Sequence, residues 1–450
     1  MKLPSKLTSF EQFLYFDDYP AYPNTIGCRL RLRGTLDESL FDRAVQLVCD
    51  RNPLFKTTLE NRWSGPRWSA CHDRTIVEQL SDHLIEAPFV KKIDLDKEAG
   101  GQVHWASDSD QASINFLTHH ATADGIGGLQ VVADWLAAYA AMTEATSDVE
   151  KAGTQSTRRT NLDLLDKRAS YGFCRWRFLK TIPRQMIGVF GVKEFIANRP
   201  VSLTGEPPVD VAASIPADYP GVHSAEFGDV ERVRSQAGTE NVTTNDLILQ
   251  CIFIAIAKWR RIRSIGSEKD LIRLMVPINL RSLSDRYLPA SLRSSIVTLD
   301  RPQERCTDEK EFLDTIRFQM NVIKANELGY TFLHVLNFSK WLPRGIKRYA
   351  NPHRVGATAL VTNLGEPFKR VKLPRDDEGK LRVGNMTLEG LDLIAPLRPH
   401  TNAAFAIYRY AGKTVLSLTY DNRVMQAEDA KQLTQMVCDE FHSKTKNAFG

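Results

Sequence analysis

The spacing of apolar residues changes near residue 120, from the two-residue period of a strand to the longer period of a helix. Residues 113–120 alternate in a way that predicts a strand, with His120 on one face and His119 on the other. From residue 126 onward, apolar residues recur every three or four positions, which predicts a helix. The turn between them, residues 121–128, contains three glycines, which permit unusual backbone angles or the close approach of a ligand.

The rest of the chain also mixes predicted strands and helices, so we expect an α/β protein. Residues 25–34 and 271–279 predict strands, and residues 37–49 and 247–260 predict helices. Five prolines lie between residues 200 and 220, where few apolar positions are periodic, and such a segment is stiff and joins a core poorly. Because 450 residues favour two domains, we predict an N-terminal unit (1–200), a Pro-rich linker (201–220) and a C-terminal unit (221–450).

Composition narrows the class of protein. The net charge of +5 is too small for this length to indicate nucleic-acid binding, so we expect no such partner. The seven cysteines are scattered and form no CxxC pair, which favours a reducing compartment. The N-terminus lacks the pattern of a signal peptide, and the longest apolar segment, residues 247–257, is too short to span a bilayer. We therefore expect a cytoplasmic protein.

The turn after the first strand carries a recognisable motif. His119, His120, Asp124 and Gly125 stand at the four defined positions of HHxxxDG. In this setting, between a strand and a helix, the sequence resembles the superfamily of nonribosomal peptide synthetase condensation domains, wax ester synthase-like and BAHD acyltransferases, and chloramphenicol acetyltransferase. The resemblance implies two chloramphenicol acetyltransferase-like lobes, each a mixed β-sheet flanked by helices, with the active-site channel between them.

The resemblance extends to two other segments. Residues 276–281 match the family pattern VPxxxR, which implies that Arg281 forms an ion pair with Asp124. An arginine fork can hold a carboxylate through two hydrogen bonds, so this pair would fix the loop that positions His120. Residues 357–365 resemble the family's crossover strand and its SNxG turn, with Thr362 in place of serine. Asn363 would then either donate a hydrogen bond near the reaction centre or only cap the turn.

The chemistry implied is acyl transfer from a thioester, supplied by acyl-coenzyme A or an acyl-phosphopantetheine carrier protein, to a small-molecule hydroxyl or amine acceptor. A neutral histidine can accept a proton from the attacking acceptor, so His120 is the candidate general base. His119 should be structural. The backbone N–H groups that begin at Gly125 could favour developing negative charge at the start of the helix. No permanently bound cofactor is expected.

Two other functions stay open. A metal-dependent hydrolase would use His119, His120 and Asp124, but strand alternation separates the two rings, so we expect no metal site. A noncatalytic condensation-domain-like binding module would keep the fold without activity. Separately, residues 158–193 carry nine basic residues, two acids and interleaved aromatic residues. This stretch predicts either a peripheral membrane contact or, as we favour, a solvated helix packed on the first domain.

Overall fold

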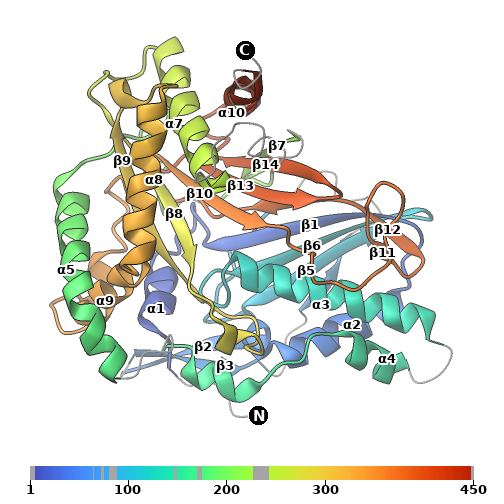
Figure 1. Ribbon diagram of the computed structural model, residues 1–450. Coiled ribbons are helices and arrows are strands. Elements are labelled where there is room, and N and C mark those ends of the chain that lie inside the picture. The colour runs from blue at the N-terminus through green and yellow to red at the C-terminus, as the bar shows by residue number, and fades with distance from the viewer. Residues whose placement is uncertain are drawn as a thin grey trace.

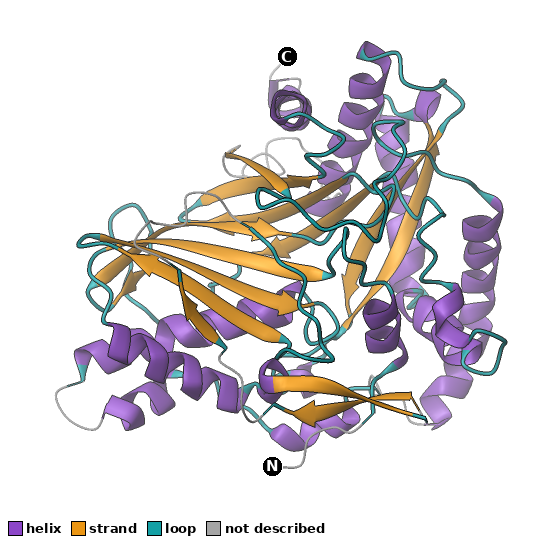
Figure 2. Ribbon diagram, turned by 180° about the vertical axis from the view of Figure 1, so that it is seen from behind, coloured by secondary structure: helices purple, strands orange, loops and turns teal. Residues whose placement is uncertain are grey.

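The computed structural model describes residues 6–63, 65–71, 76–80, 89–145, 149–169, 175–226 and 243–446. These residues form two six-stranded sheets, a two-stranded hairpin and surrounding helices (Figures 1 and 2). We call the part around the first sheet the first lobe and the part around the second sheet the second lobe. The predicted α/β fold with two sheets flanked by helices is confirmed.

The first sheet is mixed, since its β4–β5 pair is parallel and its other pairs are antiparallel. In spatial order its strands are β11 (Arg382–Val383), β12 (Met386–Ile394), β1 (Thr25–Arg33), β6 (Gln111–His119), β5 (Gly101–Ser107) and β4 (Val77–Gln79). The helices of this lobe are α2 (Glu38–Arg51), α3 (Gly125–Glu144) and α4 (Val149–Ser156). The side chain of Asp37 caps α2. Buried apolar side chains of α2, α3 and the sheet form one core.

The second sheet is also mixed, with β10 parallel to both of its neighbours. Its order is β7 (Gly221–Glu226), β14 (Lys413–Tyr420), β13 (Ala403–Tyr410), β10 (Ala359–Gly365), β8 (Leu271–Asn279) and β9 (Ser294–Pro302). The helices α7 (Thr244–Ile262), α8 (Lys310–Ala325) and α10 (Ala427–Lys446) belong to this lobe. The side chain of Thr243 caps α7, and the helix packs its apolar residues into the second core.

A third group of elements lies where the lobes meet. It contains α1 (Ser9–Phe16), α9 (Gly329–Ser339) and the short helix η5 (Gly345–Arg348), with α5 (Arg175–Ala197) packed on α9. The remaining elements are β2 (Thr57–Arg62), β3 (Gly65–Ala70), η1 (Pro53–Lys56), η2 (Leu162–Lys167), η3 (Leu283–Asp285) and η4 (Gln303–Arg305).

Two strands from the second half of the chain join the first sheet, and the sequence did not identify them. Residues 357–365 were expected to contain the crossover strand, but β10 lies inside the second sheet between β8 and β13. The strands that join the first sheet are β12, which pairs antiparallel with β1, and the short β11 at its outer edge. Local apolar patterns predict that a strand forms but not which strand it pairs with. The first sheet therefore draws strands from both sides of the Pro-rich segment, and the domain boundary at 201–220 stays a prediction.

Candidate functional site

The two motif histidines lie at the end of β6 and face opposite sides. His120 follows the last residue of the strand and lines a cavity together with Phe116 and Thr118, the residues that share its face. The side chain of His119 is completely buried away from that cavity. Its Nδ1 accepts a hydrogen bond from the Ala121 backbone N–H at 3.1 Å, which places the proton on Nε2, 3.8 Å from the Asp18 carboxylate. This environment fits the structural role expected for His119.

Asp124 is buried and fully engaged. Its two oxygens accept hydrogen bonds at 2.8 Å from the two terminal nitrogens of Arg281, in the two-bond arrangement expected from the sequence. The same carboxylate also accepts from the backbone N–H of Gly127, where it caps α3, and from the backbone N–H of Arg293, both at 2.8 Å. The ion pair therefore fastens the start of α3 in the first lobe to residues 281–293 of the second half.

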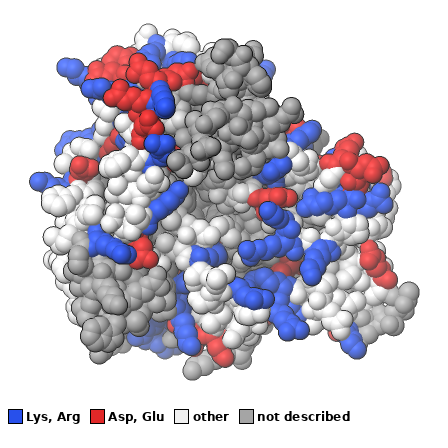
Figure 3. Space-filling model, in the orientation of Figure 1, with Lys and Arg blue, Asp and Glu red and all other residues white. Residues whose placement is uncertain are grey.

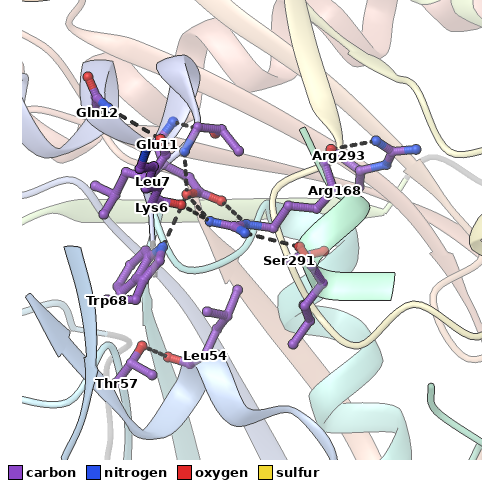
Figure 4. A network of polar contacts seen from close by, with 12 residues as sticks. Lys6, Leu7, Glu11, Gln12, Leu54, Thr57, Trp68, Arg168, Ser291 and Arg293 are labelled. Atoms are coloured by element: carbon purple, nitrogen blue, oxygen red, sulfur yellow. Dashed lines mark hydrogen bonds and ion pairs between the residues drawn. The ribbon is translucent and has the colours of Figure 1, made fainter. Parts of the chain in front are cut away.

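A second network, part of which Figure 4 shows, supports residues 281–293, the segment that binds Asp124. The guanidinium of Arg293 binds the Asp285 carboxylate at 2.7 and 2.8 Å and the backbone carbonyl of Arg168 at 2.7 Å. Arg168 in turn binds the completely buried carboxylate of Glu11 at 2.7 and 2.8 Å. Glu11 also accepts from the Trp68 indole at 3.1 Å. A continuous set of polar contacts thus runs from Glu11 of α1 through Arg168 to Arg293, whose backbone N–H binds Asp124.

The cavity beside His120 lies between the lobes and has about 1410 Å³ of empty space, part of it open to solvent. Most of its lining is apolar, from β1, β6, α1, α3, β10 and β12: Phe10, Phe13, Leu14, Ile26, Phe116, Ile126, Leu129, Val132, Leu360, Leu364, Leu393 and Ile394. Polar and charged residues form the smaller part of the lining, and His120 is one of them. Ligand sites combine these two features, a mostly apolar wall and a small number of placed polar groups.

Gly125 and Asn363 both line this cavity. Gly125 is the first residue of α3, where backbone N–H groups have no partner within the helix and the helix dipole favours negative charge. The Asn363 side-chain oxygen accepts a hydrogen bond from the Gly365 backbone N–H at 3.0 Å. Asn363 therefore caps its turn.

The surroundings of His120 favour its neutral form. Burial lowers the pKa of the ring below its ordinary value of 6.5, and the nearby charge of Asp124 offsets only part of this effect. Its Nδ1 is buried without a hydrogen-bond partner among the described residues. Burial would raise the pKa of Asp124, but Arg281 and the backbone donors lower it overall, so the carboxylate stays charged.

Sequence reasoning missed Arg293 and the pair formed by Asp17 and Arg398. Arg293 orients Asp124 through its backbone N–H, a contact with no local sequence signal. Asp17 and Arg398 both line the cavity and form a two-bond ion pair at 2.5 and 2.8 Å. They are 381 positions apart in the chain, and no motif links them.

The basic stretch 158–193 is described only in part, since residues 170–174, with Tyr171 and Phe173, and the side chains through residue 183 lie outside the described residues. Residues 175–197 form α5, which packs on α9 of the interlobe group. The favoured expectation placed this helix on the first domain. Helix α5 therefore lies in a different position from the one expected.

The motif residues do not converge as metal ligands would. His119 and His120 face opposite sides of the strand, and Asp124 is held by Arg281. Within the described ranges, no group of three or more His, Cys, Asp or Glu side chains is arranged to hold a metal ion. None of the described helices combines the length and apolar character needed to cross a membrane.

Comparison with known proteins places the fold. No family model matches the sequence, and no curated protein gives a significant match. Among solved structures, a variant of the starter condensation domain of rhizomide synthetase RzmA in complex with C8-CoA is 13% identical, with a TM-score of 0.67 over 100% of this chain and 95% of that chain. The first condensation domain of the CDA synthetase is 14% identical (TM-score 0.65, covering 98% and 96%). Polyketide synthase associated protein 5 from Mycobacterium tuberculosis is 14% identical (TM-score 0.65, covering 99% of both chains). The chain thus has the condensation-domain fold, as its motif predicted.

Proposed function

We propose that this protein is an acyltransferase that moves an acyl group from a thioester to a hydroxyl or amine, with His120 as the general base. The observation that carries the proposal is the position of His120, which lines a largely apolar cavity between the lobes. Its ring is favoured in the neutral form. The ion pair of Asp124 with Arg281 fixes the turn that follows His120. The condensation-domain fold supports it.

The proposed reaction uses His120 to move the proton and the start of α3 to stabilise negative charge. Nε2 of His120 removes the proton of the acceptor hydroxyl or amine as its oxygen or nitrogen attacks the thioester carbonyl carbon. The negative charge that develops on the carbonyl oxygen is stabilised by backbone N–H groups at the start of α3, near Gly125, and by the amide of Asn363. The carbon–sulfur bond then breaks, and the leaving thiolate recovers the proton from His120. No covalent enzyme intermediate is needed.

The donor fits the same cavity. Its apolar wall suits a hydrocarbon acyl chain, because each methylene removed from water there contributes about 0.8 kcal/mol. The solved RzmA domain contains C8-CoA, which makes coenzyme A a reasonable donor to test first. An acyl-phosphopantetheine carrier protein is the other source of the same thioester chemistry.

The test is thiol release from a panel of acyl-coenzyme A and acyl-pantetheine thioesters, with mixed alcohol and amine acceptors. His120→Ala should lower the rate by about 10²- to 10⁴-fold, the usual contribution of a positioned base. The exposed His353 lies outside the cavity, and His353→Ala should keep the wild-type rate. An unchanged rate in His120→Ala would contradict the proposal. Thioester binding without turnover by the wild-type protein would instead favour the noncatalytic module.

A further inference from the structure

Charge is unevenly distributed over this protein. On the face in Figure 3, acidic side chains gather at the upper left, and Lys and Arg predominate across the lower middle. Along the chain, residues 328–365 contain no Asp or Glu at all. The same residues contain five cations: Lys340, Arg344, Lys347, Arg348 and Arg354. This segment includes α9, the turn after it and η5, and all of its Asp, Glu, Lys and Arg side chains are positive.

Large aromatic side chains stand exposed among these cations. Phe338, near the end of α9, is 67% exposed, and Trp341, in the following turn, is 87% exposed. Lys340 lies between them and is exposed too. Soluble proteins usually bury most of a tryptophan, and exposed apolar groups that cluster mark contact surfaces. The mixture of aromatic and cationic side chains is typical of groups that reside at a membrane–water interface.

Helix α5 adds apolar side chains beside this segment. It packs on α9 through Gly188, where an added Cβ would lie 2.2 Å from the Thr331 hydroxyl oxygen, and through a hydrogen bond from Thr331 to Gln185. The opposite face of α5 is exposed and mostly apolar: Met186 (56%), Val189 (56%), Phe190 (67%) and Ile196 (58%). Lys193 and Glu194 of α5 are exposed as well.

These elements also form the outer side of the cavity wall. Phe10 and Phe13 of α1 line the cavity. Both rings make edge-to-face contacts with Phe332 of α9, at centroid distances of 5.5 and 5.6 Å. Helix α9, which also carries the exposed Phe338, therefore packs directly behind the part of the cavity wall that α1 forms.

We infer that residues 186–196 of α5, together with α9 and residues 340–348, form a surface that binds membranes rich in anionic lipids, without crossing them. Phe and Trp side chains would enter the boundary between headgroups and acyl chains, while Lys and Arg contact lipid phosphates. A fluid bilayer adapts to side chains spread over several elements, whereas a protein partner must match each of them in shape. The inference concerns binding and does not depend on the proposed reaction. Binding to a membrane through this surface would place the apolar cavity beside a source of apolar substrates.

The test is co-sedimentation of the full-length protein with two kinds of vesicle, phosphatidylcholine alone and phosphatidylcholine with about one third phosphatidylserine. We expect binding to the anionic vesicles only, and release at about 0.5 M salt, where charges are strongly screened. Phe338→Ser/Trp341→Ser and Lys340→Glu/Arg348→Glu should each weaken binding by about tenfold or more. Circular dichroism should be unchanged, because all four side chains are exposed.

Matched controls lie elsewhere on the surface. Trp63 is fully exposed beside β2, and Phe318 is 71% exposed on α8. Trp63→Ser/Phe318→Ser removes the same two side-chain types and should bind anionic vesicles like the wild type. Binding that is equal in all variants, or no binding to anionic vesicles, would overturn the inference. Binding of a polyglutamate peptide that needs the same residues, without vesicle binding, would assign the surface to an acidic protein instead.

Discussion

At the scale of single residues, the protonation state of His120 sets when the proposed base can work. Burial lowers the pKa of the ring below 6.5, so the neutral form persists at lower pH than for an exposed histidine. We predict that kcat/KM for thioester transfer decreases on the acidic side only, as the pH falls through a midpoint below 6.5. The measurement is the rate of thiol release across the pH range, corrected for the rate without enzyme. A midpoint above 6.5 would mean that another group limits the reaction.

Arg281 contributes to both stability and positioning. Arg281→Ala leaves the Asp124 carboxylate buried with only its backbone donors, and removing one partner of a buried ion pair costs about 3 kcal/mol. We predict that urea unfolding shows this loss at neutral pH. The lowered pKa of Asp124 means that the stabilisation is present above its ordinary pKa of 3.8 and disappears as the pH falls through the lower folded value.

The matched variant is Arg281→Lys, which keeps the positive charge but cannot form both hydrogen bonds with Asp124. It should recover part of the stability and less of kcat, since orientation of the His120 loop depends on the two-bond geometry. Equal stability of Arg281→Ala and the wild type would show that the ion pair does not hold the loop.

At the scale of elements, the start of α3 depends on how closely it approaches residues 289–293. A Cβ on Gly127 would lie 3.0 Å from the Ser291 carbonyl oxygen and 3.0 Å from the Ala123 Cβ. Gly127→Ala should therefore displace the helix start, destabilise the protein by about 1–3 kcal/mol and lower kcat. The nearest atom to a Cβ on Gly128 is 3.7 Å away, so Gly128→Ala is the matched control and should be tolerated. Equal unfolding midpoints for the two variants would contradict this account.

Most elements could be predicted from sequence because their signals are local. The strand at 271–279 was predicted with the observed bounds, and the helix after Asp124 starts within one residue of the expected position. Pairing between distant segments could not be predicted in the same way. The crossing of β12 and the ion pair of Asp17 with Arg398 arise from tertiary packing. The Asp124–Arg281 pair was an exception, because both residues stand in family motifs, HHxxxDG and VPxxxR.

At the scale of the whole molecule, the lobes are joined by more than the chain connection. β12 belongs to the first sheet, while the carbonyl of Leu393 accepts a hydrogen bond from Ser417 of β14 in the second sheet at 3.1 Å. We predict one cooperative unfolding transition instead of two, followed by tryptophan fluorescence and circular dichroism in urea. Trp105 and Trp135 report on the first lobe and Trp259 on the second. Two resolved transitions in the fluorescence or circular dichroism curve would show that the lobes unfold independently.

The position of β12 in the chain also matters during synthesis. The ribosome has made β1 and β6 long before it reaches Met386–Ile394, so the edge of β1 that β12 will cover waits through some 350 residues of translation. Its unpaired N–H and C=O groups can pair with other nascent chains in that interval. Production in cells should therefore depend on chaperones that shield this edge until translation is nearly finished.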